Sequence, residues 1–437
     1  MAICGLFLSA CGNLGSSNGA STSGNSSNKG TQLTGQAAAG DYQSVIKNGR
    51  YVTSKSRGVN VSQNDNQFNL KSFESGLLTV SKKVYSPSKY IFEEGQYLNT
   101  STVQNWLGRK SKSNPDGLNP VNNGKTDPNT RNPIYLQQME EQDFMKQNGK
   151  KLTLSGVTIG LGMNSVDYYE KKNFGSTYQT KISKAEAQRE GRQIANRVLA
   201  RLRQKPALKN VPITIALYRQ APTDSLVGGS FFSYSNNKAG ATTVSSWKPI
   251  SEQNYVYPTT SSKATNGNSG SGNSNDEASF ENFKSQIQNY FPNLSGVTAQ
   301  AHYTNKQLTG MNVNITTQFY SQTEIISFTQ YLQQAAQKYL PSNAPIDITV
   351  SSTEGVQSFL SRDNGAKKFT SHVFNSYWLK FASIKNSTGL NLKTSAILSH
   401  IVVVYLMCSV IYAEFLWKRE TWWQVELIKT RYNTLPR

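Results

Sequence analysis

The sequence predicts an α+β protein with a roll-like mixed N-terminal domain and a ferredoxin-like (α-β plait) C-terminal domain. At 437 residues the chain is longer than most single domains. Segments with helical periodicity alternate with segments that have strand periodicity. A Gly-, Ser- and Asn-rich linker at 259–276 separates two groups of such segments. We therefore expect one domain over 41–258 and a second over 277–377.

The first half of the N-terminal domain is predicted to hold two helices and one long loop. Residues 101–107 read as a short helix capped by Ser101 or Thr102. Residues 108–133 are rich in Gly, Pro, Asn and Lys, which predicts a single loop. Residues 134–148 have a helical pattern of apolar positions.

The second half contains the clearest elements of the chain. Residues 152–163 alternate apolar and polar side chains, as a half-buried strand does. Residues 183–205 form the best helix, because Ser183 and Glu186 make a capping box and Pro206 ends the pattern. Further strands are predicted at 211–218, 231–234 and 242–247.

The C-terminal domain is predicted from the order of its elements. Amphipathic helices are expected at 277–291 and 322–339, and strands at 296–303, 310–320, 346–350 and 368–374. With 254–257 as the first strand, the order is β-α-β-β-α-β plus one. This order is typical of a ferredoxin-like, two-layer sandwich.

The N-terminus has the pattern of a bacterial lipoprotein signal. A short apolar run leads into Leu8-Ser9-Ala10-Cys11, with small residues directly before the cysteine. In such a lipobox the Cys11 thiol is alkylated with diacylglycerol, and lipoprotein-processing peptidases cut between Ala10 and Cys11. Two acyl chains, palmitate among them, hold a protein stably on a membrane, whereas one alone is marginal.

Residues 1–10 lack one feature of a secretory signal. Such a signal carries a positively charged n-region, and the first basic residue here is Lys29. A start codon placed too late explains this truncation; the alternative is that the segment is not a signal. Residues 11–40 would form a lipidated Cys and a flexible polar tether. We therefore expect a lipid-anchored protein on the extracellular face of the bacterial cell membrane.

Sequence motifs for catalysis are absent. The chain has no G-x-S-x-G, H-E-x-x-H, Walker or C-x-x-C motif. Three Cys and three scattered His argue against a metal centre. We predict no enzyme activity, catalytic residue, metal or cofactor. The alternative is a hydrolase that uses paired carboxylates near the 108–133 loop, with candidates in Glu93-Glu94, Glu140-Glu141-Asp143 and Asp167-Glu170.

The charge balance is strongly basic. Lys and Arg number 46 against 26 Asp and Glu, which gives a net charge of +20. This charge attracts anionic cell-wall polymers and lipid head groups, or it simply keeps the protein soluble. Because a lipid anchor places the protein outside the cell, we expect no nucleic-acid partner. The favoured polymer-binding residues lie on the 183–205 helix: Arg189, Arg192, Arg197, Arg201 and Arg203.

Several short stretches together resemble the CamS-type sex-pheromone lipoproteins of Firmicutes, over about residues 8 to 377. In the first half of the chain these are Ile91-Phe92-Glu93-Glu94-Gly95-Gln96-Tyr97-Leu98, Leu118-Asn119-Pro120, Asn132-Pro133-Ile134-Tyr135-Leu136 and Glu141-Gln142-Asp143-Phe144. They continue with Leu154-Ser155-Gly156-Val157-Thr158-Ile159-Gly160, Met163-Asn164-Ser165-Val166, Tyr168-Tyr169, Arg201-Leu202-Arg203, Asn210-Val211-Pro212-Ile213 and Phe359-Leu360-Ser361-Arg362-Asp363. Their ordered co-occurrence carries the resemblance.

The resemblance implies a secreted two-domain lipoprotein whose signal peptide is processed further. A hydrophobic peptide ahead of the lipidated cysteine is then released as a pheromone. In this chain the peptide is Cys4-Gly5-Leu6-Phe7-Leu8-Ser9-Ala10. It carries Cys4 and Gly5 where the family's peptide type has β-branched or aromatic residues.

The segment 378–437 does not resemble that family. Residues 396–417 are mostly apolar and long enough to span a bilayer, and Lys418 and Arg419 follow directly. Glu414 inside the run disfavours insertion. Three interpretations stay open: a frameshift or read-through product, a second membrane anchor, and a buried helix of the C-terminal domain.

Overall fold

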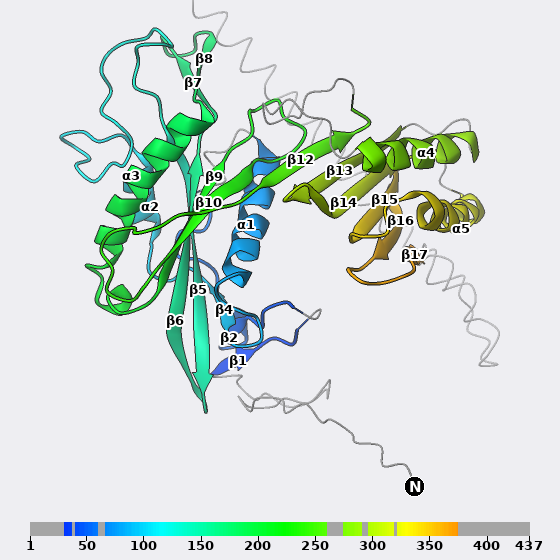
Figure 1. Cartoon of the computed structure of the whole chain (residues 1–437), viewed down its shortest axis with the longest axis horizontal. Coiled ribbons are helices and arrows are strands. Elements are labelled where there is room, and N and C mark those ends of the chain that lie inside the picture. The colour runs from blue at the N-terminus through cyan, green and yellow to red at the C-terminus, as the bar shows by residue number, and fades with distance from the viewer. Residues whose placement is uncertain are drawn as a thin grey trace, which may run out of the picture. The chain divides into compact units, whose positions relative to one another are not determined.

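The computed structural model describes residues 30–36, 40–59, 66–259, 274–290, 296–318 and 321–374 (Figure 1). Within these ranges the chain is a mixed α+β protein with four β-sheets and five α-helices. None of these helices combines the length and the apolarity that crossing a membrane requires. The predicted signal segment with Cys11 and the apolar tail 378–437 lie outside the described residues.

The N-terminal unit is built on a six-stranded mixed sheet. Its strand order is β11-β10-β9-β6-β5-β4. The two longest strands, β5 and β6, form an antiparallel pair, whereas β6 and β9 run parallel. The strands are β4 (Ile91–Glu94), β5 (Leu136–Asn148), β6 (Lys151–Met163), β9 (Ile213–Arg219), β10 (Ser230–Asn237) and β11 (Lys248–Pro249).

Helices cover both faces of this sheet (Figure 1). On one face, α2 (Thr100–Leu107) and α3 (Lys184–Leu202) pack on side chains of β5, β6 and β9. On the other face, α1 (Gln67–Lys82) packs Phe73 and Leu77 against β9 and β10. The N-terminal unit is therefore a three-layer arrangement, where the sequence predicts a roll.

Smaller elements surround the central sheet. Two of them are the 3₁₀ helix Pro206–Leu208 and the hairpin of β7 and β8. A separate three-stranded sheet precedes α1. The strands are β1 (Thr31–Leu33), β2 (Val45–Lys47), β3 (Arg50–Tyr51), β7 (Val166–Glu170) and β8 (Thr177–Lys181).

Several sequence predictions for this unit are confirmed. The 108–133 segment contains no helix or strand. Helix α3 begins as its capping box predicts, because Ser183 Oγ accepts a hydrogen bond from the Glu186 backbone N–H at 3.1 Å. Helix α2 is also present, but its cap is Asn99 and not Ser101 or Thr102.

Two local predictions are wrong, and one helix was not predicted. Residues 134–148 are not a helix: they form β5, which pairs with β4 on one side and β6 on the other. Gln, Glu and Met favour helices locally, but pairing with two neighbouring strands outweighs that preference. The segment 242–247 is not a strand, and Trp247 packs on the core from a loop. Helix α1 has no counterpart in the sequence prediction.

The C-terminal unit is a second six-stranded sheet with helices on one face. Its strand order is β12-β13-β14-β15-β16-β17, antiparallel except for the parallel pair β14 and β15. Phe280, Phe283 and Phe328 of the helices fill the core. The elements are β12 (Glu252–Tyr257), α4 (Ser274–Tyr290), β13 (Gly296–Thr304), β14 (Gln307–Thr316), α5 (Gln322–Tyr339), β15 (Ile346–Ser352), β16 (Gly355–Arg362) and β17 (Thr370–Val373).

The two layers agree with the sequence prediction, but the strand order is not ferredoxin-like. In a ferredoxin-like domain the split βαβ unit leaves room for another strand between two helix-connected strands. Here β12 pairs directly with β13 in antiparallel register, from Glu252 opposite Thr304 to Tyr257 opposite Ala299. Strand β16, which the sequence analysis missed, also extends the sheet beyond β15. The order of elements along the chain does not determine which strands pair.

Candidate functional site

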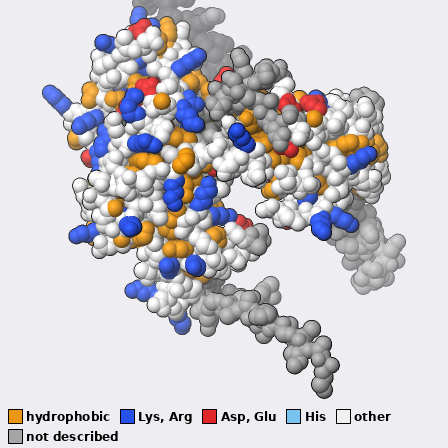
Figure 2. Space-filling view, viewed as in Figure 1, with side chains coloured by type: hydrophobic (Ala, Val, Ile, Leu, Met, Phe, Trp, Pro, Cys, Tyr) orange, Lys and Arg blue, Asp and Glu red, His pale blue; other side chains and the backbone are white. Residues whose placement is uncertain are grey.

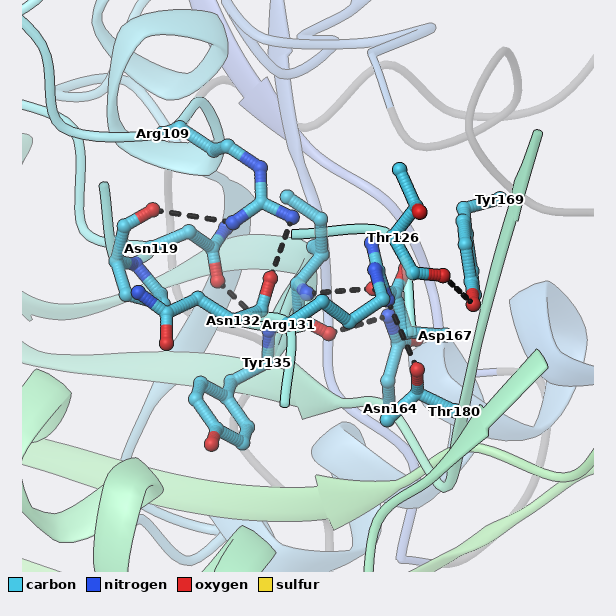
Figure 3. Close-up of polar contacts among 12 residues, drawn as sticks. Arg109, Asn119, Thr126, Arg131, Asn132, Tyr135, Asn164, Asp167, Tyr169 and Thr180 are labelled. Carbon is cyan, nitrogen blue, oxygen red and sulfur yellow. Dashed lines mark hydrogen bonds and ion pairs between the residues drawn. The ribbon is translucent and has the colours of Figure 1, made fainter. Parts of the chain in front are cut away.

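A buried ion pair fixes the end of the 108–133 loop (Figure 3). Arg131 Nη1 lies 2.6 Å from Asp167 Oδ2, and both side chains are almost fully buried. The same carboxylate oxygen accepts the backbone N–H of Ile134 at 2.8 Å. The Arg131 guanidinium also donates to Thr180 Oγ1 and stacks over the Tyr169 ring at 3.8 Å. All of these contacts are made within the fold, so the Arg131 guanidinium has a structural role.

Asn119 and Arg109 hold the rest of the loop (Figure 3). Asn119 is buried and uses both ends of its amide, donating to two backbone carbonyls and accepting from two backbone amides. Arg109 donates to the carbonyls of Pro120 and Asn132 at 3.1 and 2.8 Å. The carbonyls bound by Asn119 belong to Leu107 and Leu136, and the amides to Tyr135 and Leu136. These side chains replace the secondary structure that the loop lacks.

A small polar cavity lies beside this network. Its volume is about 60 Å³, and Asn69, Asn164, Asp167 and Gln220 are among its lining residues. Small organic ligands usually occupy cavities of roughly 300–1,000 Å³. The cavity therefore has room for water molecules but not for such a ligand.

The acidic clusters predicted from the sequence meet on the central sheet. Strand pairing places Glu93 opposite Asp143 and Glu94 opposite Gln142. Because side chains alternate along a strand, Glu93, Glu141 and Asp143 lie on one face, while Glu94 lies on the other. Asp167 is elsewhere and is neutralised by Arg131. The structure thus joins two of the three predicted acidic clusters, but away from the 108–133 loop.

The carboxyls on the first face hold the turn at residues 95–98. Glu141 Oε2 accepts the backbone N–H groups of Tyr97 and Leu98 at 3.0 and 2.8 Å. Asp143 Oδ2 accepts the N–H of Gln96 at 2.9 Å, and Glu93 pairs with Lys47. Burial raises the pKa of Glu141 to about 7, and burial together with the nearby Glu141 raises the pKa of Asp143 well above its usual value. These acids are structural acceptors for the turn.

Raised carboxyl pKa values give a pH-dependent stability. The pKa is about 8 for Glu140 and about 7 for Glu141 and Glu252, against about 4 in an unfolded chain. Between these limits the folded protein binds more protons than the unfolded chain, so its stability falls as pH rises. We expect the free energy of unfolding, measured with urea, to fall by more than about 1 kcal/mol from pH 5 to pH 8.

One variant and one opposing titration help to assign the pH dependence of stability to the buried acids. Asp143→Asn removes one of the buried acids and should flatten the dependence. His302, whose pKa is lowered by burial, acts in the opposite direction, but only below its unfolded pKa of about 6.5. A stability that rises steadily from pH 5 to pH 8 would contradict the assignment of buried acids.

The five arginines predicted for polymer binding do not share one environment. Arg189, Arg192 and Arg197 are exposed on α3, and Arg201 is partly covered where it lies over the Trp106 ring at 5.3 Å. Arg203 is buried and donates to backbone carbonyls, so it belongs to the fold and not to a binding surface. Figure 2 shows basic side chains spread over the face in view, with few acidic ones among them.

The residues of the lipidation and peptide predictions, Cys4 to Cys11, lie outside the described residues. Within the residues that are described, no group of three His, Cys, Asp or Glu side chains is placed to hold a metal ion.

Comparison with solved structures defines the class of protein. A sex pheromone precursor from Lactobacillus salivarius is 54% identical, covers 80% of this chain and 100% of its own, and superposes with a TM-score of 0.75. The C-terminal domain of the sex pheromone staph-cAM373 precursor from Staphylococcus aureus is 28% identical, covers 72% of this chain and 99% of its own, with a TM-score of 0.61. No curated protein matches the chain.

The family is defined by the sequence model that matches the chain. Residues 51–368 match the family described as CamS sex pheromone cAM373 precursor. This match extends over most of the chain, including the 108–133 loop, the buried acids and both six-stranded sheets except strand β17. The chain belongs to the CamS family, which confirms the resemblance inferred from the ordered motifs.

Proposed function

We propose that this protein is made as a precursor that is anchored by a diacylglycerol on Cys11 and releases the peptide Cys4–Ala10. The observation that carries the proposal is the lipobox Leu8-Ser9-Ala10-Cys11 in a member of the CamS family. Small residues before the cysteine fit a membrane peptidase that cuts between Ala10 and Cys11. The folded units would then stand outside the cell membrane on the polar segment 11–40, and would serve no catalytic role.

Cys11→Ser tests the anchor and the peptide together. We expect the wild-type protein, expressed in a Gram-positive host behind its genomic upstream sequence, to partition into detergent and to begin at a diacylglyceryl-Cys11. The serine variant should stay in the aqueous phase, uncut, and the heptapeptide should be absent from the medium. Mass spectrometry of the N-terminal peptide and of the culture medium measures both outcomes.

Cys408→Ser is the matched control, because it removes a different thiol. It should partition and be processed like the wild type. An unacylated, uncut wild-type protein would refute the anchor. An acylated protein without any released heptapeptide would leave the anchor intact and refute the pheromone-type peptide.

A second candidate function is binding of anionic cell-wall polymers or lipid head groups. The observation that favours it is the exposure of Arg189, Arg192 and Arg197 on α3, in a chain with a net charge of +20. Each basic side chain near an anionic surface contributes about 1 kcal/mol, and the contribution falls with salt. Binding of this kind needs no pocket.

Replacing Arg189 and Arg192 by Gln should weaken retention on immobilised teichoic acid roughly tenfold at low salt. The matched control is the double change of Lys367 and Lys368 to Gln, which removes the same charge from an exposed segment of the C-terminal unit. Equal losses in both variants would mean that only net charge matters. Retention that does not change with salt would exclude this function.

A further inference from the structure

A cavity of about 480 Å³ lies between helix α1, strands β4 and β5, and residues 54–58. This volume is within the range of sites for small organic ligands, roughly 300–1,000 Å³. Leu70 and Leu78 of α1, with Phe92 and Met139, supply an apolar wall. The polar wall is acidic and contains Glu74, Glu94 and Glu140. Glu141 also borders the cavity, although its carboxyl group accepts the backbone N–H of Leu98.

Glu94 already has its partners within the fold. Its Oε1 lies 2.7 Å from Arg57 Nη2, and its Oε2 accepts the backbone N–H of Ser54 at 2.6 Å. Tyr51, from β3, is also hydrogen-bonded to this carboxylate. Arg57 is the basic residue among those that line the cavity, and its charge is committed to Glu94. Among the described lining residues, Glu74 and Glu140 therefore have no cation of their own. The remaining lining acid, Glu141, is bound by backbone N–H groups.

Glu140 has an unused acceptor. Its side chain is half-buried. Oε1 accepts a hydrogen bond from Gln142 Nε2 at 3.0 Å, whereas Oε2 is buried and has no hydrogen-bond partner among the described residues. Leaving a buried acceptor unpaired is unfavourable, and more so for a charged one. A small rotation of the Glu140 side chain would turn this oxygen toward an N–H donor in the cavity and satisfy it.

We propose that this cavity binds an organic cation, a primary ammonium or guanidinium group carried on an apolar body. Glu140 Oε2 accepts from the cation, Glu74 adds negative charge from α1, and the apolar wall receives the body of the ligand. The proposal is independent of lipidation and of peptide release, because it concerns a site in the folded N-terminal unit.

The lining excludes the other common ligand classes. A metal ion needs several close ligands, and no cluster of three suitable side chains occurs in the described ranges. An anion would face Glu74 and Glu140 with Arg57 already paired. A wholly apolar ligand would leave Glu140 Oε2 unsatisfied. A cation with an apolar body meets both walls of the cavity.

The titration of Glu140 provides a further signature. Burial, and to a lesser degree Glu74 and Glu94, raises the pKa of Glu140 to about 8. Burial and then Glu94 also raise the pKa of Glu74, which Arg57 partly offsets. In the free protein at pH 6.5 Glu140 is therefore mostly protonated, and a cation binds better once the proton has left. The affinity for a cation should rise as pH increases through about 8.

The test compares 2-phenylethylguanidinium with its neutral isostere 2-phenylethylurea by titration calorimetry on the whole protein. The guanidinium group stays charged over the pH range used. We expect it to bind with a Kd on the order of 1 mM or tighter at pH 8.5, at least tenfold more tightly than the urea. From pH 6.5 to pH 8.5 its affinity should rise more than tenfold.

Glu140→Gln keeps the shape of the side chain and removes the charge. It should weaken guanidinium binding at least tenfold, abolish its pH dependence, and leave urea binding unchanged. Glu354→Gln, an exposed change in the turn between β15 and β16, is the matched control and should have no effect. Thermal unfolding checks that the Glu140→Gln variant is folded, and Glu74→Gln provides a second, milder loss.

Three outcomes would overturn the proposal. They are no binding of the guanidinium at millimolar concentration, equal binding of urea and guanidinium, and an unchanged affinity in both the Glu140→Gln and the Glu74→Gln variants. Saturable binding of a divalent metal that displaces the guanidinium would likewise contradict the proposal, because the cavity would then be a metal site.

Discussion

Replacing Asp167 by Ala is expected to lower the free energy of unfolding by about 3–5 kcal/mol, the usual cost of leaving one partner of a buried ion pair alone. Arg131 would keep its charge in an environment where its side chain is almost fully buried. The backbone N–H of Ile134 would also lose its acceptor, which lies 2.8 Å away. Urea unfolding at neutral pH measures the loss.

The 108–133 loop should report the same change locally. Because Arg131 and Asp167 tie the end of the loop to β7, trypsin should cut the loop of the Asp167→Ala variant much faster than that of the wild type. Asp116→Ala is the matched control, since Asp116 is exposed and lies 3.7 Å from Arg201. Exposed pairs contribute about 0–1 kcal/mol. A loss below about 1 kcal/mol for the Asp167 variant would refute the structural role of this pair.

The local elements that could be predicted share strong signals within a short window. Helix α3 has an N-cap at Ser183 and an apolar stripe that includes Ile194 and Val198, and both features are in the structure. The 108–133 loop is predictable from its Gly, Pro and Asn content. These signals depend on neighbours within a few residues, so the sequence alone is sufficient to place them.

The strand order of both six-stranded sheets depends on contacts between distant residues. Strand β9 pairs with β6 across α3, and β12 pairs with β13 across the linker and α4. No local sequence pattern determines which of several equally apolar strands will pair with each other. The prediction of a ferredoxin-like sheet failed for this reason, although its elements were mostly placed correctly.

The acidic cavity could not be predicted because two of its walls were misassigned. Residues 134–148 read as a helix, and α1 was not recognised. In a helix, Glu140 and Glu141 would lie about 100° apart on one surface, whereas in β5 they point to opposite faces of the sheet. Glu141 therefore supports the 95–98 turn and Glu140 faces α1. Adjacent identical residues acquire different roles from strand pairing alone.

Arg203 was predicted to lie on the binding surface, but the fold buries it. Net charge and helical spacing gave no sign that its environment differs from that of Arg189. The difference arises after the end of α3, because the chain turns back at Pro206–Leu208 and brings several carbonyls around one guanidinium. Backbone carbonyls have no sequence signature.

Replacing Arg203 by Ala should cost about 3–5 kcal/mol of unfolding free energy, because hydrogen bonds to a charged group contribute about 1.5–3 kcal/mol each but are not additive. Its guanidinium donates to the carbonyls of Leu208 and Val211 at 2.5 and 2.7 Å, and to those of Ala241 and Lys238 at 2.8 and 2.9 Å. Truncation would leave buried acceptors unpaired and open a cavity. Urea unfolding at neutral pH measures the effect.

Arg203→Lys separates the fork geometry from the charge. Lysine keeps the charge but cannot reach four carbonyls that surround a planar guanidinium, so it should recover less than half of the loss. Arg189→Ala, on the exposed part of the same helix, should change stability by about 0.5 kcal/mol or less. If the lysine variant were as stable as the wild type, charge alone would account for Arg203. If the alanine variant were as stable as the wild type, Arg203 would not be needed for the fold. It would then be available to join Arg189 and Arg192 in binding an anionic partner.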